Sequence, residues 1–393
     1  MAVNCGSSSI KYKLFEMPEE KVICSGLIER IGKEDAIFTI KYNGEKKTET
    51  LPILDHAKGV SLVLNALIDM GIVSSLEEIE CVGHRVAQGG KFFKKSAYLR
   101  DDNDTEKNIE SLIPLAPLHN PAHLVGYHSF KKALPNAIEI AVFDTAFHGT
   151  MEAEDYTYAI PYQLAEKYDI RRYGFHGTSH QYLSELGAKK YGANRIIVCH
   201  LGSGASICAV KDGKSIATSM GMTPEAGIMM GTRCGDIDPS IVTFIEEKEG
   251  YTAEETDNIL NKKSGLLGVS GVSNDSRDVQ AAAAEGNEHA ILAQKLFARR
   301  VADFIGQYYV RLGGCDLIIF SGGIGENSAI DRKNILDRIS EALGIIWDES
   351  KNNVHGEETL LSKEGSRVKV VVLPTDEEVM IARDCYKALK GTL

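Results

Sequence analysis

Residues 195–210 read RIIVCHLGSGASICAV, two apolar segments on either side of a short glycine and serine turn. The start of the chain repeats this arrangement in residues 3–15, VNCGSSSIKYKLF, and aligning Asn4 with His200 superimposes the two turns. Glycine and serine let backbone N–H groups and hydroxyls approach phosphate oxygens closely. We interpret the pair as an internal duplication with one phosphate-binding hairpin in each half. The alternative is two unrelated hairpins, because glycine turns are common.

The segments around these hairpins alternate between strand-like and helix-like patterns. Apolar residues at helical spacing predict a helix near 56–70 and a long helix over 287–312. Asn43 and Gly44 predict a hairpin turn. Strands that run into loops are predicted within 79–90 and 138–148. A buried strand that ends in glycines is predicted within 315–327, and a strand followed by a closing helix within 368–389. This alternation predicts an α/β protein of two similar domains with a nucleotide cleft between them.

Length and charge exclude several classes of protein. The 393 residues fit two domains, and a formal net charge of −11 without a basic block argues against nucleic acid and anionic membrane as partners. No apolar run approaches the ~20 residues that a membrane-spanning helix needs, and the N-terminus lacks a secretory leader. The eight cysteines include no C-x-x-C pair. We therefore expect buried or free thiols, no zinc site and a cytoplasmic protein.

Two arginines stand where α/β proteins bind ligands. Arg85 follows a predicted strand in GHRVAQGG, and Arg233 lies between glycines in MGTRCGDIDP. Most arginines are solvated or structural, but a pair in such loops suits a phosphoryl group, whose charge spreads over three oxygens. Asp144 ends the strand IEIAVF. It either forms a turn or acts in the cleft, where it would orient a nucleophile or hold an arginine.

Two further motifs carry titratable side chains. YGFHGTSH places two histidines in a predicted Gly/Ser loop, and a protonated His176 could stabilise charge on a phosphate, although a hydrogen-bonded loop histidine is the simpler reading. Thr375 and Glu378 have the spacing of a capping box, which gives Glu378 a structural role. Glu377 is then the freer carboxylate, and it could be one of the one or two carboxylates that Mg²⁺ takes besides phosphates.

Nine blocks in this order resemble the acetate kinase family of acyl-phosphate-forming kinases. The resemblance covers the whole chain, and the blocks together are far more specific than any one motif. That family belongs to the superfamily of sugar kinases, heat-shock ATPases and actin, which is built from duplicated domains. The blocks are NCGSSSIK, GHRVAQGG, PLAPLHNP, VFDTAFH, YGFHGTSH, HLGSGAS, TSMGMTPEAGIMMGTRCGDIDP, SGGIGENS and PTDEEVMIARD.

The resemblance implies a phosphotransferase with a carboxyl group as acceptor. It would transfer the γ-phosphoryl group of ATP reversibly to acetate, giving ADP and acetyl phosphate, with Mg²⁺ or in its place Mn²⁺. The implied fold is a pair of actin-like, ribonuclease H-like domains. The first domain would take residues 1–146 plus 375–393. The second, 147–374, would hold the nucleotide and the interface of a homodimer.

The resemblance also assigns roles to individual residues. Asn4 and Glu377 would hold the metal, and Lys11 would contact the ATP phosphates. His176 and Arg233 would stabilise the phosphoryl group in transfer. The nucleotide site would be lined by His200, Leu201, Gly202, Ser203, Gly204, Asp275, Ser276, Arg277, Gly323, Ile324, Gly325, Glu326 and Asn327. The acyl pocket would be walled by Ala87, Leu118, Phe175 and Pro224.

Arg85 would bind the substrate carboxylate, and Asp144 stands at the family's acid/base position. A carboxylate acceptor needs no deprotonation near neutral pH. We therefore expect Asp144 to hold Arg85 or to position the substrate.

Four positions depart from the family's pattern. Ser203 replaces the usual Asn, Gln88 replaces His, Ala217 replaces Asp, and Ala87 replaces the Val of acetate-preferring members. A methylene in an apolar pocket is worth ~1–3 kcal/mol of discrimination, so Ala87 predicts activity with propionate close to or above that with acetate. In the alternative, a neighbouring side chain fills the space and acetate stays preferred.

Three other functions compete with this reading. A family member that uses pyrophosphate as donor would block the adenosine pocket near Gly323 and Ile324, which look open here. An actin-like or heat-shock ATPase would need an appended partner-binding region. A sugar kinase fits two cleft arginines less well, because its acceptor is a neutral hydroxyl group.

Overall fold

An eight-stranded sheet organises the first of two units of the chain, which comprises Met1–Phe147 and Asp376–Leu393. The computed structural model describes residues 1–117 and 119–393. In sheet order the strands are β5 (Glu45–Ile53), β4 (Lys33–Tyr42), β3 (Lys21–Glu29), β2 (Ser9–Glu16), β1 (Ala2–Gly6), β6 (Cys81–Val86), β8 (Ile138–Phe143) and β7 (Ala97–Tyr98). The helices are α1 (His56–Asp69), α2 (Thr105–Ser111), α3 (Asn120–Ala133) and α14 (Glu377–Leu389).

A six-stranded sheet organises the second unit, His148–Thr375. Its strands, in sheet order, are β11 (Lys214–Thr218), β10 (Ala205–Lys211), β9 (Arg195–Leu201), β12 (Leu317–Ser321), β14 (Lys369–Val372) and β13 (Thr359–Leu360). The helices are α4 (Ala153–Tyr156), α5 (Tyr162–Tyr168), α6 (Gly177–Tyr191), α7 (Ser240–Glu249), α8 (Ala253–Lys262), α9 (Gly265–Ser270), α10 (Ser276–Ala284), α11 (Glu288–Arg311), α12 (Gly322–Asn327) and α13 (Ala329–Leu343).

The two sheets share one topology. Strands β3-β2-β1-β6-β8-β7 of the first unit correspond in order to β11-β10-β9-β12-β14-β13 of the second. The third, fourth and fifth strands of each set are mutually parallel, and the others pair antiparallel. The α/β fold with an internal duplication, predicted from the two hairpins, is therefore confirmed.

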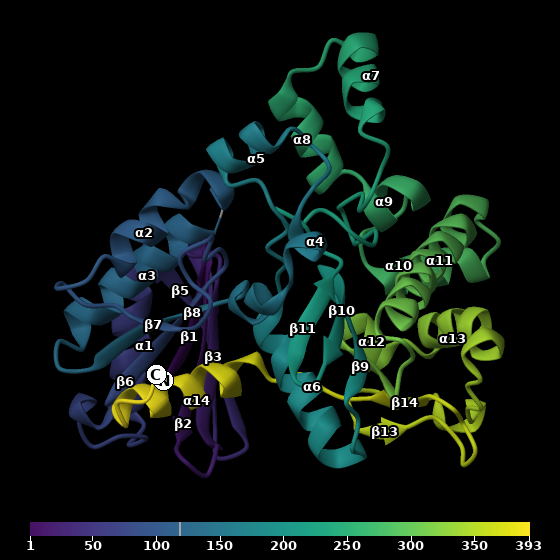
Figure 1. The fold of residues 1–393 in the computed structure, drawn as a ribbon. Helices are drawn as coiled ribbons and strands as arrows, with labels where there is room; N and C mark the ends of the chain where they lie inside the picture. The colour runs from purple at the N-terminus through teal and green to yellow at the C-terminus, as the bar shows by residue number, and fades with distance from the viewer. Residues whose placement is uncertain (118) are drawn as a thin grey trace. The chain divides into compact units, whose positions relative to one another are not determined.

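Helices cover both faces of each sheet, and the parallel strands accordingly carry buried apolar residues on both faces. In the first unit α1 and α3 pack on the face that carries Val3, and α14 packs on the face that carries Ala2. The C-terminal helix α14 thus returns to the unit that contains the N-terminus (Figure 1). Among the described residues, no helix has the length and apolar character needed to cross a membrane.

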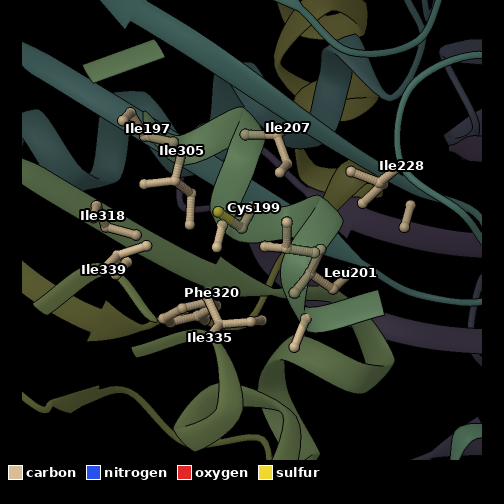
Figure 2. Packing of buried hydrophobic residues seen from close by; sticks show 14 of the residues in the cluster. Ile197, Cys199, Leu201, Ile207, Ile228, Ile305, Ile318, Phe320, Ile335 and Ile339 are labelled. Carbon is tan, nitrogen blue, oxygen red and sulfur yellow. The ribbon is translucent and has the colours of Figure 1, made fainter. Parts of the chain in front are cut away.

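The core of the second unit lies between its sheet and helices α11 and α13. Alternate residues of β9 and β12 enter this core, while Gly187 of α6 approaches Leu317 and Ile319 on the other face. Figure 2 shows the cluster formed by Ile197, Cys199, Leu201, Ile207, Ile228, Ile305, Ile318, Phe320, Ile335 and Ile339. All eight cysteines are free and seven of them are buried, as expected from the sequence.

Candidate active site

Three parallel strands of the first unit end beside one another and carry its candidate residues. Asn4 lies in β1, Arg85 in β6, and Asp144 directly after β8. The register aligns Val3 with His84 and Arg85 with Val142, so all three side chains belong to the carboxyl edge of the sheet. Ligands of α/β sheets bind at this edge.

Asp144 holds the guanidinium of Arg85 with both of its oxygens. Arg85 Nε donates to Oδ1 at 2.9 Å and to Oδ2 at 3.1 Å, and Nη2 donates to Oδ2 at 2.6 Å. The carboxylate is buried, whereas 24% of the Arg85 side chain is exposed. Burial disfavours the charge of Arg85, but the neighbouring Asp144 outweighs it and raises the pKa. Nη1 of Arg85 takes no part in this pair, so the Nη1 side of the guanidinium is not covered by Asp144.

The start of α14 differs from the predicted capping box. Asp376, not Thr375, is the N-cap, and its side chain accepts from the N–H of Val379 at 3.2 Å. Glu378 forms ion pairs with Lys11 and with Lys13, the latter at 3.3 Å. Although burial opposes ionisation, the two lysines lower the pKa of Glu378. Lys11, expected at the ATP phosphates, therefore has a carboxylate partner in the described structure.

Glu377 is the carboxylate of this helix without a described ion pair. Its pKa is raised, chiefly by burial and further by the charges of Asp144 and Glu378, while Arg85 opposes the shift. Among residues 1–117 and 119–393, no group of three or more His, Cys, Asp or Glu side chains could hold a metal. The donors available at this edge are thus one carboxylate and the partly buried amide of Asn4. Such a pair fits Mg²⁺, which keeps several waters and takes its other ligands from substrate phosphates.

The second unit carries the hairpin quoted at the outset. Residues 202–204 form its turn between β9 and β10. A side chain at Gly204 would come within 3.3 Å of Arg233 Nη1 and 3.7 Å of His176 Nε2, so both groups border the turn. A Cβ at this position would make a tight contact with the end of the Arg233 side chain and an ordinary contact with the His176 ring. The turn, Arg233 and His176 are therefore brought together.

Arg233 has no carboxylate ion pair among the described residues. Its Nη1 donates to the carbonyl of Pro224 at 3.4 Å. Burial lowers the pKa of Arg233, and Glu225 only partly offsets this shift. A partly buried cation without an ion pair among the described residues is suited to an anionic ligand.

His176 does not lie in a loop, as the sequence suggested for YGFHGTSH. It is the N-cap of α6, with the left-handed φ of 57°, and His180 lies in the first turn of that helix. His176 Nδ1 lies 2.9 Å from Ser206 Oγ, and the His176 and His200 rings are 4.4 Å apart. The glycine and serine composition therefore marked a helix start instead of a loop.

The remaining nucleotide residues form two groups around the hairpin. Glu326 in α12 accepts from Gly322 N–H at 2.9 Å and from Thr375 N–H at 3.2 Å, which joins the ends of β12 and β14. The glycines in which the predicted strand ends begin this short helix. Asp275 caps α10 and pairs with the exposed Arg277, which lowers the pKa of Asp275 to about 2.

The four acyl-pocket positions are not all described by the structure. Ala87 is buried in the first unit, and Phe175 is buried in the second, where Pro224 is partly buried. Leu118 lies outside the described residues. Gln88, beside Ala87, is fully buried, and its Oε1 accepts from the N–H of Gly90 at 2.9 Å. Gln88 therefore shapes the backbone next to Ala87.

Sequence reasoning missed a set of hydroxyl groups that contact the histidines. Ser206 Oγ lies 2.7 Å from His180 Nε2, and Ser179 Oγ lies 2.7 Å from His200 Nδ1 and from Thr375 Oγ1. These partners come from different elements of the fold. The one local signal was a serine at position 206 inside an otherwise apolar strand.

Comparison with known proteins points in one direction. The model of the Acetokinase family matches residues 1–383. The chain is 54% identical to the acetate kinase of Bacillus subtilis strain 168, with 99% of each chain covered. The crystal structure of Porphyromonas gingivalis acetate kinase superposes with a TM-score of 0.93 at 43% identity, covering 99% of this chain and 98% of that one. A propionate kinase from Francisella tularensis gives a TM-score of 0.91 at 42% identity, covering 98% and 97%.

Proposed function

This chain belongs to the acetokinase family, and we propose from that premise that it transfers the γ-phosphoryl group of ATP reversibly to acetate. The products are ADP and acetyl phosphate. The acceptor oxygen of acetate attacks the phosphorus directly, so that one P–O bond forms as the bond to the ADP oxygen breaks. Catalysis of this kind depends on positioning and on neutralising charge.

The observation that carries this proposal is the double contact between Asp144 and Arg85. Both oxygens of Asp144 are engaged, so the carboxylate is placed to hold Arg85 and not to accept a proton. A hydroxyl acceptor, as in a sugar kinase, needs a base, whereas acetate is already ionised near neutral pH. The remaining side of Arg85 then binds the acetate carboxylate.

His176 and Arg233 act on the phosphoryl group. Both border the glycine of the hairpin turn, and Arg233 supplies a cation without a carboxylate partner in the described structure. The turn provides backbone N–H groups for phosphate oxygens. Charge that builds up on the equatorial oxygens in the transition state is neutralised by these donors.

Mg²⁺ would be held by Glu377 and Asn4, the carboxylate and the amide described above at the carboxyl edge of the first sheet. Bound there with ATP, the ion would offset the charge of the phosphates. Glu378 is less suited, because Lys11 and Lys13 already neutralise it. Mn²⁺ takes the same oxygen ligands and would substitute.

Propionate is a second acceptor, because Ala87 is smaller than the valine usual in acetate-preferring members. In the test, Ala87→Val is compared with the parent chain. The larger side chain is expected to lower kcat/KM for propionate about tenfold relative to acetate, the value of one methylene. Ala36→Val, the same substitution at a buried position of β4 in the same unit, is the control for packing. If the ratio of kcat/KM for propionate to kcat/KM for acetate does not change, Ala87 does not line the acyl pocket.

The activity itself is tested by trapping the acyl phosphate as its hydroxamate. The chain is incubated with ATP, Mg²⁺ and acetate, and ADP is measured in parallel. Equal amounts of ADP and hydroxamate, both dependent on acetate, are expected. ADP formation at the same rate with and without acetate would instead indicate an ATPase. Acetyl phosphate formation with pyrophosphate but not with ATP would indicate that pyrophosphate is the phosphoryl donor.

We also propose which unit binds each substrate, the oligomeric state of the chain and its cellular compartment. We assign carboxylate binding to the unit Met1–Phe147 with Asp376–Leu393 and nucleotide binding to His148–Thr375. A homodimer formed through the second unit is testable by sedimentation at several protein concentrations. The eight free cysteines support a reducing compartment such as the cytoplasm.

A further inference from the structure

Four histidine rings of the second unit form a cluster. The ring centroids of His176, His180 and His200 are 4.4 to 6.4 Å apart, and His148 lies 5.7 Å from His180. Ser206 of β10 links two of these rings, with its Oγ 2.9 Å from His176 Nδ1 and 2.7 Å from His180 Nε2. A single hydroxyl group thus joins the histidine at the hairpin to a histidine in the core.

The hydroxyl of Ser206 has only one proton to share between these two rings. Its oxygen can accept from either ring nitrogen, but its proton can go to only one. The described structure gives this hydroxyl no hydrogen-bond partner besides these two rings, so its proton is donated to the ring nitrogen that lacks one. The direction of these two hydrogen bonds is therefore set by the histidine whose ring proton can be assigned to one nitrogen. His180 is that histidine, because it is fully buried.

His180 has one nitrogen with a partner and one without. Its Nε2 contacts Ser206, while its Nδ1 is buried with no hydrogen-bond partner. Burial, together with the neighbouring His148 and His200, lowers the pKa of His180 well below its ordinary value, so the ring is neutral. Buried donors without a partner are rarer than buried acceptors without one. The single ring proton is therefore on Nε2, and it is donated to Ser206.

We propose that His180 and Ser206 act as positioning residues that fix His176 in the tautomer with its proton on Nε2. Ser206 accepts from His180 and must donate to His176 Nδ1. The proton of a neutral His176 is then on Nε2, the nitrogen that faces Gly204 and shares that turn with Arg233 Nη1. His176 offers an N–H donor there whether neutral or charged. The catalytic consequence rests on the proposed function, but the tautomer does not.

The other charged and titratable groups around His176 do not reverse this assignment. His200 stacks near it and uses its own Nδ1 on Ser179. Arg233 has only protons to give and lies on the Nε2 side of the ring. Neither of these two groups contacts Nδ1 of His176, whose described hydrogen-bond partner is Ser206.

The direct test is NMR of the chain with isotope-labelled histidine, whose ring-nitrogen shifts distinguish the two tautomers. Spectra are recorded near pH 8.5, about two units above the ordinary imidazole pKa. The signals of His176 are identified by their loss in His176→Asn. Nitrogen shifts of a protonated Nε2 and an acceptor Nδ1 are expected in the parent, and a mixture of tautomers in Ser206→Ala. A proton on Nδ1 in the parent, or no change in the variant, would overturn the proposal.

Kinetics give a second readout with matched variants. Ser206→Ala is expected to lower kcat about tenfold, with KM for acetate and ATP changed less than about twofold. Ser215→Ala is the control, since Ser215 is an equally buried serine that lies 2.8 Å from His148 Nδ1 instead. It should leave kcat and the His176 spectrum close to the parent values.

Ser206→Thr and Ser206→Val separate the hydroxyl group from packing, because the two side chains share one shape. Thr is expected to retain the parent tautomer and a higher kcat than Val. Equal spectra for Thr and Val would contradict the role of the hydroxyl. A parent chain that shows the expected tautomer but forms no acetyl phosphate would disprove the proposed function alone.

Discussion

Arg85 and Asp144 illustrate how one contact decides between two chemistries. A carboxylate at the end of a strand in an active site can act as a base or as a clamp. Here two hydrogen bonds from Nε and Nη2 of Arg85 engage both of its oxygens. A bidentate pair is strong and fixes the guanidinium plane, which favours the clamp.

A double-mutant cycle on this pair tests the clamp. Arg85→Lys and Asp144→Asn should each raise KM for acetate at least about tenfold, because neither keeps a bidentate pair. If Asp144 acts through Arg85, the double variant should be little worse than Arg85→Lys alone. KM for ATP serves as the internal control. Two results together would instead assign Asp144 to proton transfer. The loss in the double variant would equal the product of the two single losses, and Asp144→Asn would lower kcat without raising KM for acetate.

Single residues could be predicted from the sequence where their partners are close to strand ends. Holding Arg85 was one of two roles expected for Asp144, because a carboxylate acceptor needs no base, and the structure contains this contact. Glu377 was expected to be the freer carboxylate because of a capping box with Thr375, and that reason was wrong. Ion pairs of Glu378 with Lys11 and Lys13 are the physical cause, and pairs so distant in sequence leave no local pattern.

Helix α14 connects the chain's C-terminus to the carboxyl edge of the first sheet. Its first turn carries Glu377 and Glu378, and its N-cap Asp376 also receives a hydrogen bond from Lys13 at 2.9 Å. Acidic residues at a helix start interact favourably with the helix dipole. The cap therefore sets both the stability of the helix and the place of the proposed metal ligand.

Replacing the cap separates these contributions. Asp376→Ala is expected to cost about 1 kcal/mol of unfolding free energy, the usual value of an N-cap. Asp376→Asn keeps an oxygen for the Val379 N–H but loses the charge pair with Lys13, so it should cost about 0.5 kcal/mol or less. Urea denaturation followed by circular dichroism measures both. Equal losses would show that charge, and not capping, stabilises this end of α14.

Elements with regular patterns were predicted within a few residues. The helix expected near 56–70 is His56–Asp69, and the helix expected over 287–312 is Glu288–Arg311. The short helix α12 and the start of α6 were missed. Both begin in glycine-rich segments, where propensity favours turns and only tertiary packing forms a helix.

Buried histidines make the stability of the whole molecule depend on pH. Burial, aided by the charge of Arg85, lowers the pKa of His123 to about 3. An unfolded chain protonates this ring below about pH 6.5, whereas the folded chain does not. The unfolded state therefore binds more protons, and stability falls as the pH drops from about 6.5 toward 3.

The variant His123→Leu isolates this effect. Between pH 7 and pH 5 the unfolding free energy of the parent should fall about 2 kcal/mol more than that of the variant. Urea denaturation of both chains at each pH gives the difference, and carboxylates that titrate in the same range cancel between them. Parallel pH dependence in the two chains would mean that His123 is protonated in the folded state.

For the whole molecule, the internal duplication of the sheet was the property most easily predicted from the sequence. Two hairpins alike in sequence are enough to suggest two similar sheets, because each turn requires the same small residues between apolar strands. The added strands β4 and β5 of the first unit have no counterpart in the shared topology. The cluster formed by His148, His176, His180 and His200 was not predictable, since it depends on how α6 packs against β9 and β10.

The central claim is that an oxygen of acetate itself attacks the γ-phosphorus, with no base from the protein. Acetate labelled in both oxygens with a heavy isotope tests it most directly. The acetyl phosphate formed from unlabelled ATP is examined by phosphorus NMR, where a heavy oxygen bonded to phosphorus shifts the signal. The account predicts one heavy oxygen on phosphorus in every product molecule. Phosphorus bonded only to light oxygen would show that a phosphate oxygen attacked the acyl carbon, and would contradict it.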